Sequence, residues 1–259
     1  MPTHKYTEYA QYKDTIAGFC TFCGFWHLLA PKTDEYYDAD QFYGTFSAPD
    51  WFHKEKGEHD AGLWDASYDY QLGLLRKYNE LQPQNLLDIG CGAGWFVRHA
   101  RRRGYSCVGV DPSDSALAFL GLKEIHKKIP DERFAAIRAS LVLEHIPDPY
   151  MALFNWHSHL RYNGLLMIIV PNDFSPLQKK LKTQHFISPV HANYFQPITL
   201  TSLLENTGFE VIHQSATFPM ELPLILGYDY RGNDQKGRKV HRARLYFEKL
   251  LGTNAFRLY

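Results

Sequence analysis

The residues with the clearest chemical potential form a glycine-rich turn between two acids. Segment 86–111 reads LLDIGCGAGWFVRHARRRGYSCVGVD, so that Asp88 precedes three glycines at alternate positions and Asp111 ends a second apolar run. A dinucleotide site spaces its glycines G-x-G-x-x-G and holds pyrophosphate against a helix N-terminus. Here the spacing is G-C-G-A-G, and the adjacent carboxylate would repel a pyrophosphate but suit an ammonium group. The pattern therefore favours a ligand with an ammonium group and no phosphate.

The second acid, Asp111, indicates that the ligand also contains a nucleoside. Asp111 lies 21 residues after Gly90, close to the roughly 20-residue offset at which a carboxylate accepts hydrogen bonds from ribose hydroxyls. S-adenosylmethionine is a nucleoside with an ammonium group and no phosphate, so it satisfies both acids. We predict it as the cofactor.

The elements around the turn predict how it is held. Trp64, Tyr68, Leu72 and Leu75 recur at helical spacing, and Pro83 follows them, which predicts a helix that ends before residue 82. Short apolar runs then alternate with helical stretches, which predicts a Rossmann-like, doubly wound α/β fold with a mainly parallel sheet and helices on both faces. Ligands of such sheets bind beyond the carboxyl ends of the strands, where the glycine turn falls.

The chain changes character near residue 60. Residues 1–59 are aromatic, rich in histidine and poorly periodic, so we expect an irregular N-terminal extension before a Rossmann-like domain at 60–259. Lys plus Arg (28) equals Asp plus Glu (28), so the chain has no net positive charge that would attract nucleic acid. The aliphatic run at 165–170 is far shorter than a membrane span, and residues 1–14 lack a secretion signal. A cytoplasmic location is expected, and the oligomeric state stays unknown.

Five segments between about residues 80 and 217 make the chain resemble the class I S-adenosylmethionine-dependent methyltransferases. They are LLDIGCGAG, VGVDPS, ASLVLEHIPDP, LRYNGLLMIIVPND and HANYFQPITLTSLLENTGFEVI. The resemblance implies that the glycine turn cradles the methionine part, that Asp111 contacts the ribose, and that segment 140–145 lines the methyl-transfer site. The implied cofactor-binding residues are Asp88, Gly90, Cys91, Gly92, Gly94, Asp111, Pro112, Ser140 and Leu141.

The chain departs from this family at three places. Only 22 residues separate Asp111 from Phe134, so the third strand should be short, within EIHKKI. The adenine contact would fall to Asp131 or Glu132, unless these are solvated loop charges. The sixth strand is expected in FEVIHQSATF, and a seventh strand looks short or missing.

Three residues are candidates for catalysis. His191 and Tyr194 match the His-x-x-Tyr segment of sugar C-methyltransferases, a resemblance that implies that both face the acceptor. Val190 stands where those enzymes carry an acid, so the histidine would lack an orienting partner, and it could instead only fasten a loop. His145 follows the fourth strand and is the alternative base, unless it hydrogen-bonds the backbone there.

A cysteine pair raises the question of a metal. Cys20 and Cys23 form one half of a zinc knuckle, but structural zinc needs four ligands, and only His27, His53 or His59 were candidates to complete the set. We therefore expect no metal. Neither of the other two thiols suggests a nucleophile.

The acceptor is expected to be a small molecule. Amine-directed DNA methyltransferases carry an Asn-Pro-Pro-Tyr type of pocket after the fourth strand, where this chain reads LEHIP, so nucleic acid is not expected. We predict methyl transfer to oxygen or carbon of a sugar-like or phosphorylated metabolite, which the basic segment 231–249 could grip unless it is only a solvated helix. The alternatives are a degenerate, non-catalytic S-adenosylmethionine-binding protein and a nucleotide-dependent oxidoreductase.

Overall fold

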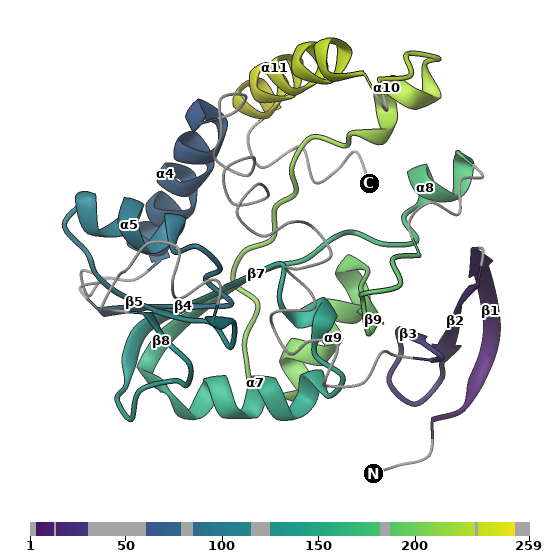
Figure 1. Ribbon diagram of the computed structural model, residues 1–259. Coiled ribbons are helices and arrows are strands. Elements are labelled where there is room, and N and C mark those ends of the chain that lie inside the picture. Colours follow the sequence, from purple (N-terminus) through teal and green to yellow (C-terminus); the bar gives the residue numbers. More distant parts are fainter. Residues whose placement is uncertain are drawn as a thin grey trace. The chain divides into compact units, whose positions relative to one another are not determined.

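The chain folds into two units, which Figure 1 draws as a computed structural model. The structure describes residues 4–12, 14–30, 61–78, 85–114, 125–181, 187–230 and 233–251. Unit 2 comprises residues 31–171, and unit 1 joins residues 1–30 to residues 172–259. This division differs from the expected boundary at residue 59. Within the described ranges, no helix has the length and hydropathy needed to cross a membrane.

Unit 2 is built on a parallel sheet of five strands. Their order in the sheet is β6 (Ile125–His126), β5 (Ser106–Val110), β4 (Asn85–Ile89), β7 (Phe134–Ser140) and β8 (Leu160–Ile169). Helices α4 (Ala61–Tyr78) and α5 (Trp95–Arg102) cover one face, and α7 (Pro149–Ser158) covers the other (Figure 1). The predicted Rossmann-like fold is confirmed, and the third strand is as short as expected.

The core of unit 2 explains why these segments form these elements. Helix α4 buries Tyr68, Leu72 and Leu75, the predicted apolar face, against Phe96 and Val97 of α5. Strand β7 is buried along all but its last residue, as expected for a central strand covered on both faces. Helix α7 begins after Asp148, whose carboxylate accepts a hydrogen bond from the backbone N–H of Met151.

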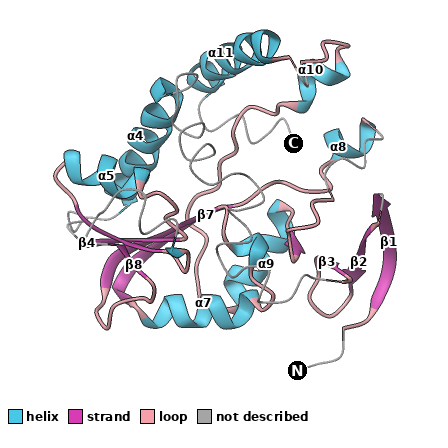
Figure 2. Cartoon of the chain, viewed as in Figure 1, coloured by secondary structure: helices cyan, strands magenta, loops and turns pink. Residues whose placement is uncertain are grey.

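Unit 1 contains an antiparallel sheet that links two distant parts of the sequence. Its strands are β1 (Tyr6–Tyr12), β2 (Thr15–Cys20), β3 (Trp26–Leu28) and β9 (Asn193–Tyr194), in that order (Figure 2). The N-terminal extension is thus more regular than expected over residues 4–30, whereas residues 31–60 lie outside the described ranges. A pattern read along residues 1–59 could not reveal this sheet, because β3 pairs with a strand some 165 residues later.

The remainder of unit 1 is helical or irregular. It includes α8 (Pro176–Lys180), α9 (Pro197–Asn206), α10 (Glu221–Ile225) and α11 (Asp234–Leu251). The sixth strand expected in FEVIHQSATF is not formed, because residues 209–218 carry no strand. The basic tail is helical, and its Arg244 pairs with Glu248, which also accepts a hydrogen bond from the backbone N–H of Phe218.

Candidate functional site

The glycine turn follows β4 and needs glycine for two separate reasons. All three glycines have positive φ angles, of 64° at Gly90, 52° at Gly92 and 72° at Gly94, a region that other L-residues rarely adopt. In addition, a Cβ atom at Gly90 would lie 2.3 Å from the Cγ2 atom of Val142. The turn therefore lies tightly against the loop that follows β7.

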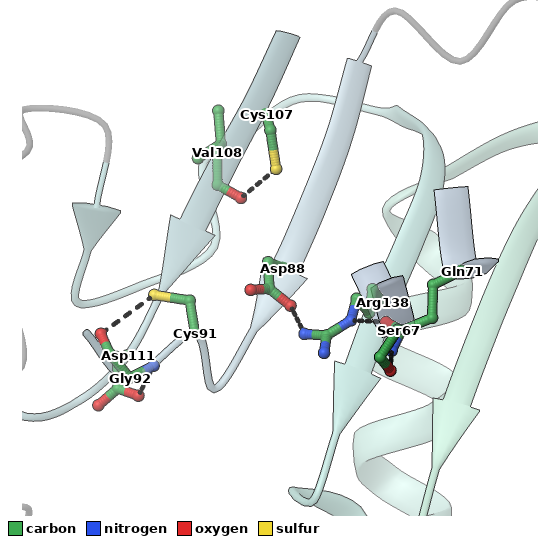
Figure 3. A network of polar contacts seen from close by, with 9 residues as sticks. All are labelled: Ser67, Gln71, Asp88, Cys91, Gly92, Cys107, Val108, Asp111 and Arg138. Atoms are coloured by element: carbon green, nitrogen blue, oxygen red, sulfur yellow. Dashed lines mark hydrogen bonds and ion pairs between the residues drawn. The ribbon is translucent and has the colours of Figure 1, made fainter. Parts of the chain in front are cut away.

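Asp111 ties the turn to the end of β5. One carboxylate oxygen accepts a hydrogen bond from the backbone N–H of Gly92 at 2.8 Å (Figure 3). The other accepts from the backbone N–H of Ser113 at 2.9 Å. Both partners are rigid backbone groups, and the carboxylate is only 3% exposed. An ionised carboxylate offers about four lone-pair sites, so it can accept hydrogen bonds from several donors at once. Pro112, the next residue, is exposed.

Asp88 points to a different partner than the sequence suggested. Its carboxylate is fully buried and lies 2.6 Å from the guanidinium of Arg138, its neighbour across the β4–β7 pairing (Figure 3). Arg138 also donates to Gln71, which in turn donates to Ser67 of the same helix. A polar chain thus runs from the base of the glycine turn into α4, and the charge of Asp88 is already matched within the protein.

The ionisation of this pair follows from the arginine. Burial raises the pKa of Asp88, and the charge of Arg138 and its hydrogen bond act against that rise. Arginine keeps its charge at any physiological pH, so a protonated Asp88 would leave a buried cation unmatched. The guanidinium also lies 4.2 Å from the ring centroid of Phe96, a cation–π contact. We therefore treat the two side chains as an ion pair.

The two cysteines of this region are packed rather than reactive. Burial raises the pKa of Cys91, and the charges of Asp88 and Asp111 add to the effect. Burial likewise raises the pKa of Cys107. The Sγ atom of Cys91 fills the space beside Gly109, where an added Cβ would lie 2.7 Å from it. Neither thiol can readily form a thiolate nucleophile here.

The loop after β7 completes the carboxyl edge of the sheet. Leu141 has a φ of 58°, and its backbone N–H donates to the carbonyl of Ile169 at the end of β8. Ser140 ends β7, and His145 ends the short helix η1 (Leu143–His145), where its side chain is half-buried. The structure thus brings the residues expected after β4, β5 and β7 to one edge of unit 2.

The acids proposed for adenine lie elsewhere. Glu132 precedes β7, and its carboxylate accepts a hydrogen bond from Asn85, the first residue of β4. Asp131 stands beside Glu132, and both are exposed. Since the strands are parallel, these residues belong to the amino edge of the sheet, opposite the glycine turn. The adenine assignment is wrong for both, and solvated loop charges are the better description.

In unit 1, His191 has an acidic neighbour that the sequence did not reveal. Its Nδ1 atom lies 3.8 Å from a carboxylate oxygen of Asp173, which is only 4% exposed. Burial raises the pKa of Asp173 to about 7, and the charge of Glu221 adds to the rise. Asp173, 18 residues before His191, thus lies beside the histidine as the acid that Val190 does not provide.

Tyr194 does not line an opening in unit 1. It is fully buried, its hydroxyl donates to the carbonyl of Ser188 at 2.7 Å, and its ring meets that of Phe174 edge-on. The ring of His191 lies 5.9 Å from it. These contacts make Tyr194 a support for segment 188–194.

The cysteine pair has more histidine around it than the sequence indicated. His27 lies beside Cys20 and Cys23, and so does His4, which has no sequence spacing that connects it to the cysteines. His53 and His59 lie outside the described residues.

Two site residues could not be chosen from the sequence, although one left a signal. Arg138 is a lone cation within the otherwise apolar strand FAAIRAS, and a buried arginine demands an acid nearby. Asp173 follows β8 in the segment PNDF, and nothing in its spacing connects it to His191.

Comparisons with known proteins agree on one family. A family model described as Methyltransferase domain matches residues 60–214. The ubiquinone biosynthesis O-methyltransferase of Bradyrhizobium diazoefficiens is 35% identical over 111 residues, which is 38% of this chain and 44% of the relative. The enzyme of the same name from Nitrobacter winogradskyi is 36% identical over 104 residues, 35% of this chain and 40% of the relative. The matched stretch thus spans less than half the length of these relatives.

Solved structures share the fold at low sequence identity. A SAM-dependent methyltransferase from Archaeoglobus fulgidus is 22% identical, with a TM-score of 0.51 over 82% of this chain and 94% of the other. The magnesium protoporphyrin IX methyltransferase of Synechocystis PCC 6803, solved with bound SAH, is 15% identical, with a TM-score of 0.52 over 72% of this chain and 92% of the other.

Proposed function

Because the chain belongs to the family of class I S-adenosylmethionine-dependent methyltransferases, we propose that it transfers a methyl group from S-adenosylmethionine to an oxygen or carbon atom of a small molecule. The glycine turn of unit 2 carries this proposal. Its three glycines with positive φ leave bare backbone at the carboxyl edge of the sheet, and the carboxylate of Asp111 holds the N–H of Gly92 in place. Such an edge is where ligands of this fold class bind.

Asp111 is the proposed ribose contact. Its two oxygens already hold backbone N–H groups, so the carboxylate cannot rotate away when the cofactor leaves. With the cofactor bound, this carboxylate would also accept hydrogen bonds from the ribose hydroxyls. A charge-assisted bond of this kind contributes about 1.5 to 3 kcal/mol. Pro112, Ser140 and Leu141 stay in the proposed cofactor-binding set as residues of the same edge.

In this proposal, Asp88 does not contact the cofactor directly. Its pairing with Arg138 offsets the charge that would have attracted the methionine ammonium group. The pair fixes the end of β4 instead, immediately before Gly90. We assign Asp88 to positioning the turn.

His191 is the proposed general base. Methyl transfer from a sulfonium requires in-line attack by the acceptor, and a hydroxyl or acidic carbon must lose its proton. The imidazole would take that proton, and the carboxylate of Asp173 would stabilise the imidazolium that forms. A histidine with a buried acid beside it suits a base better than the sequence alone indicated.

His145 remains the second candidate for the base, because it stands on the cofactor edge of unit 2. Tyr194 is assigned a supporting part, since its hydroxyl is bonded to Ser188 and its ring is buried. A variant of each residue separates these assignments. Turnover should fall on loss of whichever histidine, His191 or His145, is the base, whereas Tyr194→Phe should lower stability by about 1 kcal/mol.

The proposed acceptor is a hydroxyl-bearing small molecule, including a sugar-like or phosphorylated one. The relatives from Bradyrhizobium and Nitrobacter are named O-methyltransferases, which favours oxygen over carbon. Helix α11 supports a negatively charged acceptor, because its Arg238, Lys239 and Arg242 are exposed.

A ligand screen followed by a turnover assay tests the function. S-adenosylmethionine and its demethylated product should raise the unfolding temperature, because a ligand at 100 times its Kd adds about 2.7 kcal/mol of stability. NAD⁺ and NADPH should not. Methyl-labelled cofactor and a fractionated metabolite extract should then give a labelled product. Stabilisation by a nicotinamide nucleotide alone would establish the oxidoreductase alternative, and cofactor binding without turnover on any fraction would favour the degenerate one.

A further inference from the structure

We propose that four side chains at one end of the N-terminal hairpin bind a single structural zinc ion: His4, Cys20, Cys23 and His27. This site belongs to unit 1 and does not depend on the proposed methyl transfer. It also reverses the expectation from the sequence that the chain holds no metal.

The four ligand atoms converge in a way that a tetrahedral metal requires. Every one of them lies within 4.8 Å of the others. The Nδ1 atom of His4 lies 3.4 Å from the Sγ atom of Cys20 and 3.4 Å from that of Cys23. A tetrahedral zinc with Zn–S near 2.3 Å and Zn–N near 2.05 Å has sulfur–nitrogen edges of about 3.6 Å. The observed edges are within about 0.2 Å of that value, so a zinc ion needs little rearrangement.

The backbone around the cysteines has the form of a turn that presents both sulfurs to one point. The N–H of Cys23 donates to the Sγ atom of Cys20 at 3.4 Å, and the N–H of Gly24 donates to the carbonyl of Cys20 at 2.8 Å. Gly24 has a φ of 77°, which lets the chain reverse immediately after the second cysteine. The N–H bond to the Cys20 sulfur also favours the thiolate, the form that binds metal, over the thiol.

His27 provides a second, independent observation. Its side chain lies in the centre of β3 and is only 7% exposed, and its Nε2 atom has no hydrogen-bond partner among the described residues. A buried imidazole nitrogen left in this state is costly unless something accepts its lone pair or its proton. A zinc ion would accept that lone pair.

Binding Zn²⁺ displaces the protons of the two thiols and forms two Zn–S and two Zn–N bonds. Charge then balances, because two thiolates neutralise the divalent ion.

The ligand set identifies both the metal and its role. Two thiolates and two imidazoles in tetrahedral arrangement suit zinc, and four protein ligands leave no open position for catalysis. The ion would join the segment before β1, the end of β2 and the middle of β3. Because His27 pairs with Asn193 across the β3–β9 ladder, the ion would also stabilise the strand that follows His191.

The first test is the metal content of the full-length protein purified without chelators. Elemental analysis should find about one zinc per chain. His4→Ala is the gentlest ligand variant, because His4 is exposed and precedes β1. Its zinc affinity, measured against a chromophoric chelator, should fall by more than the roughly 10- to 100-fold that loss of a second-shell partner costs. Cys23→Ser should behave likewise.

Matched controls are the exposed His157 on α7 and the buried Cys107 on β5. His157→Ala and Cys107→Ala should each keep one zinc per chain. A chelator should lower the unfolding temperature of the wild type and leave that of His4→Ala unchanged.

A spectrum of the wild type keeps the proposal testable even if the variants fail to fold. Co²⁺ added to the metal-free protein should give the intense visible absorption of a tetrahedral site with thiolate ligands. Absence of both stoichiometric zinc and this spectrum would overturn the proposal, as would rapid alkylation of the half-buried Cys23 in the native protein as purified. A different metal at one per chain would overturn its assignment to zinc.

Discussion

The glycine turn of unit 2 and the turn at residues 20–24 of unit 1, here called the cysteine turn, have similar backbone geometry but different polar groups. Each follows a strand and uses a glycine with positive φ to reverse the chain. In the glycine turn, the two acids have partners within the protein: Asp111 accepts from two backbone N–H groups, and Asp88 pairs with Arg138 through one oxygen, while its Oδ2 atom has no hydrogen-bond partner among the described residues. In the cysteine turn, two sulfurs and two imidazoles face a common centre, and the Nε2 atom of His27 finds no partner among the described residues.

The difference indicates what each turn is for. Groups that satisfy one another form a rigid frame before any ligand arrives, which suits a cofactor that must bind and leave in every cycle. Groups that converge without satisfying one another need a permanent occupant. The acids of the first turn have their charges and geometry fixed within the protein, whereas the proposed ion would complete the second turn. The predictions below test the frame first and the more local chemistry afterwards.

Arg138→Met should produce the largest effect on the frame. The substitution keeps much of the volume but leaves the buried carboxylate of Asp88 without a counter-charge, which typically costs about 3 to 5 kcal/mol. Urea unfolding at pH 7 measures the loss. The exposed Arg98→Met on α5 should change stability by no more than about 0.5 kcal/mol. Adding Asp88→Asn to Arg138→Met should recover most of the loss, and a fully stable single variant would show that the pair does not support the turn.

Gly90→Ala should give the second-largest loss of stability. Strain at a φ of 64° costs about 1 to 2 kcal/mol, and the overlap with Val142 adds about 1 to 3 kcal/mol. Gly104 is a matched control, because it has a φ of 89° but no atom near the position of an added Cβ. Gly104→Ala should therefore show the strain alone. Equal losses in the two variants would contradict a tight contact between the turn and the loop after β7.

The sequence predicted those parts of the glycine turn that depend on local signals. The glycines, Asp111, the helix at 61–78 and the alternation of strands and helices are local signals, and each led to the observed element. The partner of Asp88 was not local, since Arg138 lies 50 residues later and only the β4–β7 register brings them together. The partner of the Asp88 side chain therefore could not be predicted from the sequence.

The same limit applies more strongly in unit 1. His4 and His27 join the cysteines only through the pairing of β1, β2 and β3, and Asp173 reaches His191 only through the tertiary fold. Spacing along the chain predicted half of a metal site and a base without an acid. In both cases the missing half came from a segment with no motif of its own.

His191→Ala should lower turnover by about 10²-fold or more, the usual contribution of a positioned base, while leaving cofactor affinity unchanged. The pH profile sharpens this assignment. Since burial and Glu221 raise the pKa of Asp173 to about 7, its carboxylate ionises only as pH rises through that value. Turnover should therefore rise between about pH 6 and 8, because the ionised acid stabilises the imidazolium. Asp173→Asn should remove this limb.

His157→Ala serves as the control for general effects of losing a histidine, and His145→Ala as the competing base. A loss confined to His145→Ala would move the assignment to unit 2. Wild-type turnover in both variants would leave the reaction to proximity and orientation alone.

The most direct test of the central claim is calorimetric titration of S-adenosylmethionine into the wild type, Asp111→Ala and Asp114→Ala. Asp114 is the matched control, because it is an exposed acid three residues after Asp111 and pairs with Lys127 at the surface. We expect the wild type to bind, Asp114→Ala to bind equally well, and Asp111→Ala to bind about 10- to 150-fold more weakly, which corresponds to about 1.5 to 3 kcal/mol. Equal affinity in all three proteins, or no binding to the wild type, would contradict the cofactor site described above.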